Sequence, residues 1–127
     1  MYDQPEAAEL LAAVRKFLEE RALPALEGHT AFHARVAVNA LAIVERQLEQ
    51  APAQEAAEAE RLTALLGREG DLDTQNRELC RRIRAGALDA ATPGLREHLW
   101  ETTLAKLAVD QPKYASYRRA LARGPAR

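Results

Sequence analysis

The chain has few of the residues and motifs that carry chemistry in small proteins. It contains a single cysteine, Cys80, which excludes an internal disulfide and a thiol-based zinc site. A Gly-rich phosphate loop, a nucleophile elbow and a dinucleotide-binding fingerprint are all absent from the sequence. We therefore expect no enzymatic activity of its own and no cofactor.

A surplus of charge is also missing. The formal net charge is -1, whereas binding to a phosphate backbone relies on clustered Lys and Arg, so we expect no nucleic-acid partner. No uninterrupted apolar stretch is long enough to cross a bilayer, so we expect no membrane partner. The first residues are acidic where a secretory signal would be basic, which together with the single cysteine favours a cytoplasmic location.

Strand signals are scarce as well, because β-branched residues are few and no segment alternates with period two. Alanine, leucine, glutamate and arginine dominate instead, which favours helix. The length of 127 residues fits one domain. The sequence thus predicts an all-α fold: a compact single-domain bundle of five to six mostly antiparallel helices over residues 1–127, with a frayed tail at about 122–127.

Proline and glycine residues mark the expected helix boundaries. Pro52 is expected to separate the second predicted helix from the third. The six predicted helices begin and end as follows: Pro5 to the Pro24–Gly28 passage, Thr30 to about Gln50, Ala53 to Gly67, Asp73 or Thr74 to Gly86, Thr92–Pro93 for about four turns, and Lys113 to Leu121.

The second predicted helix is the most apolar segment, yet it contains Arg35, Asn39 and Arg46. On a helical wheel the three polar residues share a stripe of about 40° at the rim of the apolar half. They either pair with carboxylates on neighbouring helices or present donors to a carboxylate or phosphate of a partner or ligand. The wheel predicts that the apolar half faces the core: Phe32, Val36, Ala37, Ala40, Leu41, Ile43, Val44 and Leu48.

A basic face is expected on the fourth predicted helix, where Arg77, Arg81 and Arg84 lie at helical spacing. These arginines are either solvated and favourable to the helix dipole, or they bind an anion or an acidic partner. Cys80 is assigned to the opposite, apolar side and is expected to be buried.

Three aromatic residues, Trp100, Tyr114 and Tyr117, fall in the C-terminal third. They either clamp the last helix onto the bundle or anchor a partner, because Trp, Tyr and Arg are enriched at interfaces. Trp100 is offset from the leucine stripe of its helix, which predicts a half-exposed ring.

Metal binding has little support in the sequence. His29 and His33 are four residues apart, but His29 is expected to precede its helix, and the third histidine, His98, is far away in the sequence. Without an HExxH or Glu-x-x-His pair, we expect no metal.

Four short motifs are found along the chain. The most specific is an FxxRVAxNAL segment, at Phe32, Arg35, Val36, Ala37, Asn39, Ala40 and Leu41. The others are N-R-E-L from Asn76, I-R-x-G from Ile83 and a D-x-P-x-Y run that ends at Tyr114. With these motifs the chain resembles a small bacterial family of unknown-function domains, over about Pro5 to Tyr117. One departure is Gln75, where leucine is expected.

The resemblance implies a role in a protein complex. Members of the family tend to be encoded beside an aminoglycoside-phosphotransferase-like kinase and an acyl-CoA dehydrogenase. In levulinate-type pathways, the similar protein is a partner required by a kinase that phosphorylates a hydroxyacyl-CoA. The resemblance therefore implies a non-catalytic accessory subunit of such a kinase. The candidate contacts come from the residue pattern and not from the resemblance: Arg35, Asn39, Arg46, Trp100 and Tyr114. The alternatives are an acyl-CoA- or anion-binding bundle that uses Arg77, Arg81 and Arg84, and a self-associating domain that forms a homo-oligomer.

Overall fold

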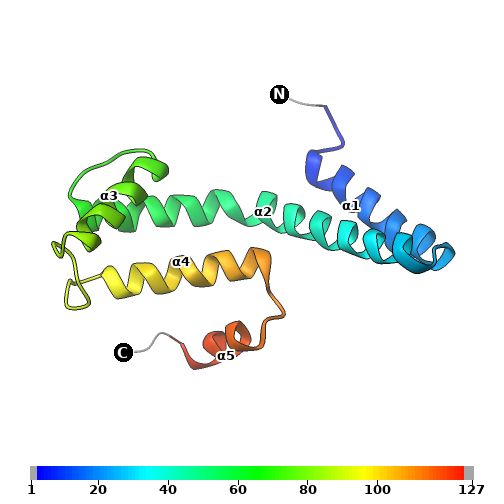
Figure 1. Cartoon of the computed structure of the whole chain (residues 1–127). Coiled ribbons are helices and arrows are strands. Elements are labelled where there is room, and N and C mark those ends of the chain that lie inside the picture. Colours follow the sequence, from blue (N-terminus) through cyan, green and yellow to red (C-terminus); the bar gives the residue numbers. More distant parts are fainter. Residues whose placement is uncertain (1–2, 125–127) are drawn as a thin grey trace. The chain divides into compact units, whose positions relative to one another are not determined.

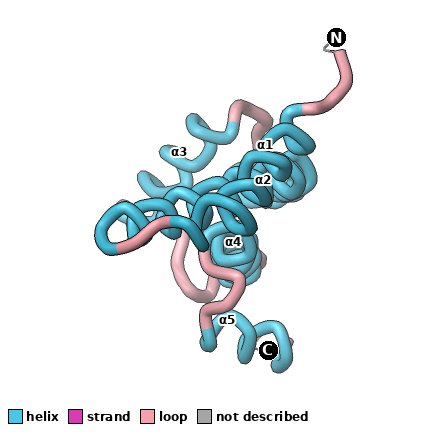
Figure 2. Tube along the Cα trace, turned by 90° about the vertical axis from the view of Figure 1, so that its right-hand side faces the viewer, coloured by secondary structure: helices cyan, strands magenta, loops and turns pink. Residues whose placement is uncertain are grey.

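A computed structural model describes residues 3–124, and every regular element in that range is helical (Figures 1 and 2). A π-helix, Leu18–Ala22, and a short 3-10 helix, Leu23–Ala25, connect the first two α-helices. The predicted all-α class is confirmed. The α-helices are α1 (Ala7–Phe17), α2 (Gly28–Leu66), α3 (Leu72–Arg84), α4 (Leu95–Asp110) and α5 (Ala115–Arg123).

The contacts divide the chain into two compact units, Met1–Ala51 and Pro52–Arg127. The first unit is an antiparallel hairpin of α1 and the N-terminal part of α2 (Figure 1). Gly28, with a positive φ of 58°, begins α2 where the chain reverses direction. The two buried residues among those described in this unit are Ala31 and Val38, so the hairpin has very little core of its own.

An ion-pair network joins the two helices of the hairpin. The Arg15 guanidinium donates from Nε to Glu45 of α2 and from Nη1 to Glu19, the latter at 2.8 Å. The hydrogen bond to Glu45 is the largest of the effects that raise the pKa of Arg15. Because these side chains are only partly buried, the network fixes the pairing of the helices more than it adds to stability.

The second unit has a larger apolar core. Leu62 and Leu66 of α2 pack with Leu79 of α3 and Leu95 of α4, and all four side chains are at most 5% exposed. Asp71 caps α3 by accepting a hydrogen bond of 3.0 Å from the Thr74 amide. Three helices therefore share one leucine cluster, and α5 lies next to α4 (Figure 1).

The expected helix break at Pro52 is wrong, because α2 runs from Gly28 to Leu66 with Pro52 inside it. Proline removes one N–H from the helical ladder. A break would instead leave up to four amides and four carbonyls without helical partners at new ends. In a segment rich in alanine and glutamate, the continuous helix is therefore favoured. The second and third predicted helices are thus one helix.

The starts of α3 and α4 also differ from the expected ones. Asp71, rather than Asp73 or Thr74, is the N-cap of α3. Helix α4 begins at Leu95, not at Thr92–Pro93. The reason is a turn before α4, in which the Asp89 amide donates to Thr92 Oγ1 at 2.9 Å and Gly94, with a φ of 84°, is the N-cap of the helix. At the other end of the chain, α5 continues through Arg123, and residues 125–127 of the expected tail lie outside the described residues.

The predicted core face of α2 is wrong for four of its six large side chains, whereas Leu41 and Ile43 are half-buried. Phe32, Val36, Val44 and Leu48 are 57%, 50%, 40% and 46% exposed. In the hairpin, α2 has one neighbour, α1, and the side that faces α1 carries small residues such as Ala31. A wheel shows which residues share a face, but not how much of that face a neighbouring helix covers.

Two polar side chains lie in the interior of the second unit. Gln75 is 1% exposed and donates from Nε2 to Thr63 Oγ1 at 3.1 Å and to the Arg68 carbonyl at 3.0 Å. It occupies the position where leucine was expected. Its two hydrogen bonds tie α3 to the end of α2 and to the following loop.

His98 on α4 is equally buried, at 1% exposed, and its Nδ1 has no hydrogen-bond partner within the described residues. Burial is the main cause that lowers the pKa of His98. The positive charge of Arg61 lowers it further, while Glu58 opposes the shift. The imidazole is therefore held neutral between α4 and the C-terminal part of α2.

Replacement of Pro52 by alanine should raise the free energy of unfolding by about 1–3 kcal/mol, because alanine restores the missing helical hydrogen bond and removes a steric clash. Urea unfolding followed by circular dichroism measures the change. Pro93→Ala is the control, since Pro93 lies in a turn, where loss of proline should lower stability by up to about 1 kcal/mol. A Pro52→Ala variant that is no more stable than the wild type contradicts a continuous α2.

Protonation of His98 should destabilise the protein. Because its folded-state pKa lies below that of the unfolded chain, the unfolded state binds the proton more tightly. The unfolding free energy should therefore be highest above about pH 6.5 and fall below it, by at most about 1.4 kcal/mol per pH unit. Chemical unfolding between about pH 5 and pH 8 tests this. His98→Gln should flatten the pH dependence; a slope equal to that of the wild type refutes the assignment.

Candidate partner-binding site

The stripe of Arg35, Asn39 and Arg46, here called the polar edge, lies along the N-terminal part of α2. Arg35 and Asn39 are exposed and Arg46 is half-buried. At about 100° per residue, the edge lies between the side that faces α1 and the exposed side chains of Phe32 and Val36. The polar edge therefore combines guanidinium and amide donors with uncovered apolar surface.

The aromatic ring of Phe32 is oriented by a neighbour. It meets the His33 imidazole edge to face, with ring centroids 5.5 Å apart and an angle of 73° between the planes. Both residues are exposed. His33 thus packs against an apolar ring beside the polar edge, and within the described residues no three His, Cys, Asp or Glu side chains are grouped as metal ligands.

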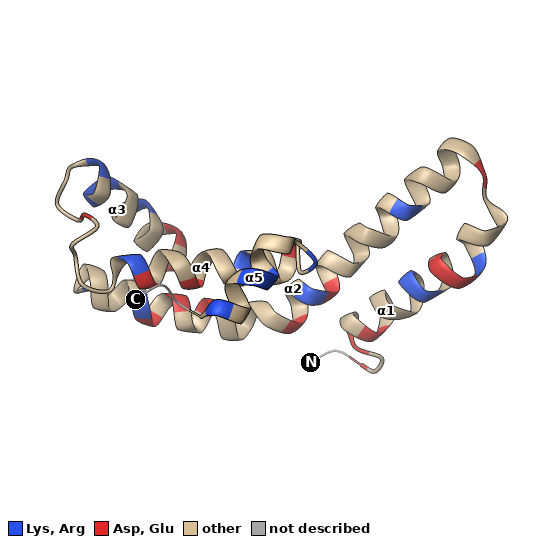
Figure 3. Cartoon of the chain, turned by 90° about the horizontal axis from the view of Figure 1, so that it is seen from below, with Lys and Arg blue, Asp and Glu red and all other residues tan. Residues whose placement is uncertain are grey.

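The predicted basic face on α3 carries balancing acids. Arg77 pairs with Asp73 at 2.8 Å, and Arg81 makes a two-pronged contact with Glu78 at 2.7 and 2.8 Å. Arg84 is also exposed on this helix. Figure 3 shows that both signs of charge are present along α3. Two of the three arginines are therefore already occupied by carboxylates, which weakens the electrostatic case for an anion site there.

Glu78 is the centre of this charged group. Hydrogen bonds from Arg81 and then from Arg82 lower the pKa of Glu78 to about 2. Arg82 is the residue that the sequence analysis overlooked here: besides binding Glu78 at 2.8 Å, it donates to the Leu66 carbonyl at 3.2 Å. Arg82 thus caps the C-terminal end of α2, and this part of the basic cluster serves the fold.

The expected burial of Cys80 is wrong, because its side chain is exposed on α3. Leu79 and Gln75, four residues apart, both point into the core. One further residue turns the helix by about 100°, which carries Cys80 away from that side. The apolar side of α3 is therefore narrower than the sequence pattern suggests.

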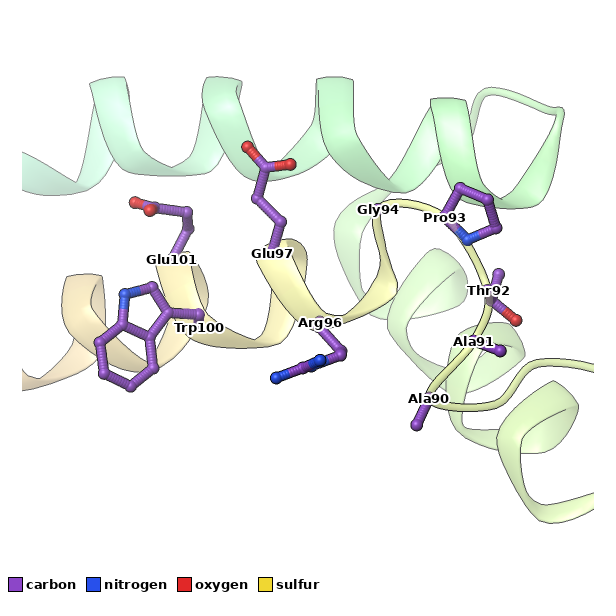
Figure 4. A pocket seen from close by; sticks show the side chains of 9 residues that line it. All are labelled: Ala90, Ala91, Thr92, Pro93, Gly94, Arg96, Glu97, Trp100 and Glu101. Atoms are coloured by element: carbon purple, nitrogen blue, oxygen red, sulfur yellow. The ribbon is translucent and has the colours of Figure 1, made fainter. Parts of the chain in front are cut away.

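The aromatic residues of the C-terminal part occupy different surroundings. Trp100 is half-buried, as expected from its offset position, and Tyr114 is 52% exposed before α5. Trp100 borders an open hollow of about 600 Å³ beside the loop 90–94. Figure 4 shows that Trp100 and Arg96 project on one side of α4, whereas Glu97 and Glu101 project on another. The hollow mixes both charges with one aromatic face, and Tyr114 does not line it.

The candidate contacts therefore belong to two separate units. The polar edge lies in the hairpin, while Trp100 and Tyr114 lie in the second unit with Arg77, Arg81 and Arg84. The burial of Gln75 and His98 was not predicted from the sequence. The leucine expected at position 75 was a signal for the first of them, because it marks an apolar position four residues before Leu79. Within the described residues, no helix has both the length and the apolar content needed to cross a membrane.

Comparison with known proteins agrees with the resemblance at the level of the family. No curated protein and no solved structure matches the chain. The family described as a domain of unknown function, DUF6285, matches residues 24–114, which include the whole polar edge and helices α2 to α4. The chain therefore belongs to the DUF6285 family of domains of unknown function.

Proposed function

We propose that this chain is a non-catalytic accessory subunit that docks onto a phosphotransferase-like kinase acting on hydroxyacyl-CoA-type substrates. The observation that carries the proposal is the exposure of the segment on which the resemblance is most specific. Phe32 and Val36 of that segment are 57% and 50% exposed, and Arg35 and Asn39 are exposed beside them. A motif that served the core alone would have its large apolar residues buried.

The chemistry of the polar edge suits a protein partner. An arginine fork recognises a carboxylate with two parallel hydrogen bonds, and an aromatic ring next to it adds contact area that is removed from water on binding. Both groups project from α2, a regular helix held against α1 by the Arg15 and Glu45 side chains. The backbone of the edge is therefore already helical before binding, which lowers the entropy cost of association. The identity of the partner as a kinase is supported by the family resemblance.

The anion-binding alternative has weaker support. It requires Arg77, Arg81 and Arg84 to present free positive charge, but Asp73 and Glu78 already pair with the first two. A coenzyme A phosphate would have to displace these carboxylates. We therefore retain docking as the proposed function.

The test is co-expression with a phosphotransferase-like kinase of the kind that the resemblance implies, followed by calorimetry of the purified proteins. The two should elute together, and Arg35→Glu should raise the dissociation constant at least about tenfold, because it places a carboxylate opposite the acids expected on the kinase. Arg84→Glu is the matched control, an equal charge reversal on an exposed helix position of the other unit.

Two outcomes would contradict the proposal. One is separate elution together with a kinase that is fully active alone. The other is loss of affinity with Arg84→Glu and not with Arg35→Glu, combined with measurable heat when the isolated chain is titrated with a coenzyme A thioester. That second pattern would favour the anion-binding alternative.

A further inference from the structure

The hairpin carries a second exposed surface that the proposed docking does not use. Leu10, Val14 and Phe17 of α1 are 54%, 51% and 60% exposed, and Val44 and Leu48 of α2 are 40% and 46% exposed. These five residues are called the apolar face. They recur three or four positions apart on each helix, which is the spacing of residues that pack against a neighbouring helix.

The geometry of an antiparallel pair puts both halves of this face on one side of the hairpin. Each helix is viewed along its axis from its N-terminus, with about 100° of rotation per residue. On α1, the three residues are then displaced roughly 80° counterclockwise from the half-buried Leu11 and Leu18. On α2, the two residues are displaced roughly 110° counterclockwise from the buried Ala31 and Val38. Because the helices point in opposite directions, rotation in the same sense on each brings both strips to the same side.

The polar edge is on the opposite side. In the same view of α2, its residues are displaced roughly 70° clockwise from Ala31 and Val38, whereas Val44 and Leu48 are displaced counterclockwise. An occupant of the apolar face therefore leaves the polar edge accessible.

We propose that the apolar face binds the same face of a second copy of this chain, so that two hairpins form a four-helix bundle. A helix in such a bundle touches two neighbours and carries two apolar stripes roughly a quarter-turn apart. Both helices of the hairpin have this pattern. On each helix, one apolar stripe packs against the other helix of the hairpin, and the second stripe, which belongs to the apolar face, is not covered by any other helix of this unit. A second hairpin supplies two helices with the same spacing.

The area and the charge fit self-association. Five large side chains that are about half exposed present on the order of 400–500 Å² per copy, so two copies would cover about 1,000 Å², near the lower limit for a specific interface. The face itself contains no charged side chain, and the net charge of the chain is -1, so two copies repel each other only weakly. The dimer should therefore be reversible, with a dissociation constant on the order of micromolar.

Sedimentation velocity of the full chain tests the proposal. At about 100 µM the chain, with a monomer mass of 14.0 kDa, should sediment as a dimer and dissociate on dilution. Val14→Glu should raise the dimer dissociation constant at least about tenfold, because dimerisation would bury a charge on each copy. Circular dichroism should remain that of the wild type, since Val14 is half exposed in the single chain.

The matched control is Val36→Glu, which makes the same change at a residue that is 50% exposed, beside the polar edge. It should leave the dimer intact while weakening the kinase complex. A wild-type monomer at the highest concentration, or equal effects of the two variants on dimerisation, overturns the proposal. Since the kinase complex is measured separately, its absence would not affect this result.

Discussion

The contact between α1 and α2 is the constraint on which the hairpin depends. Its buried residues, Ala31 and Val38, are small, so the helix axes can approach closely but remove little apolar area from water. The Arg15–Glu45 pair fixes which turns of the two helices meet. This contact sets how α1 and α2 are paired but does not enclose the larger side chains. The exposed fraction exceeds one half for Leu10, Phe17 and Phe32. The large apolar side chains of this unit are therefore accessible to other molecules.

This arrangement contrasts with the second unit, which encloses its own core. Leu62, Leu79 and Leu95 converge from three helices, and the polar interior is partly satisfied by the hydrogen bonds of Gln75. A basic residue of α3 also serves the fold, because Arg82 caps the end of α2 at the Leu66 carbonyl and is paired with Glu78. Part of the charge of the second unit thus holds its fold, whereas Arg35 and Asn39 of the hairpin are exposed at the surface.

Much of the fold could be predicted from the sequence because helix propensity and capping act locally. The all-α class, the end of α3 before Gly86 and the half-exposed position of Trp100 follow from composition and spacing. The errors arise where the flanking sequence or the packing of other helices determines the structure at a position. Pro52 was expected to end a helix, but its effect depends on the sequence on both sides.

The same reasoning explains what could be predicted of the candidate site. The wheel correctly gives the order of residues around α2, so the polar edge lies beside Phe32 as expected. It cannot give the coverage of each face, and it therefore assigned Phe32 and Val36 to a core. The burial of Gln75 depends on the Arg68 carbonyl and on Thr63, which are brought to it by the loop between α2 and α3. The roles of the polar edge and the single-domain assignment stay predictions.

The central claim is that the outer surface of the hairpin near Arg35 and Asn39 carries the function. Amide hydrogen exchange, measured on the chain alone and in the presence of the proposed partner, a phosphotransferase-like kinase, tests it most directly. The account predicts that the kinase slows exchange in the peptide covering residues 32–41 and leaves residues 72–84 of α3 unchanged. Slower exchange confined to α3, with residues 32–41 unaffected, would contradict it.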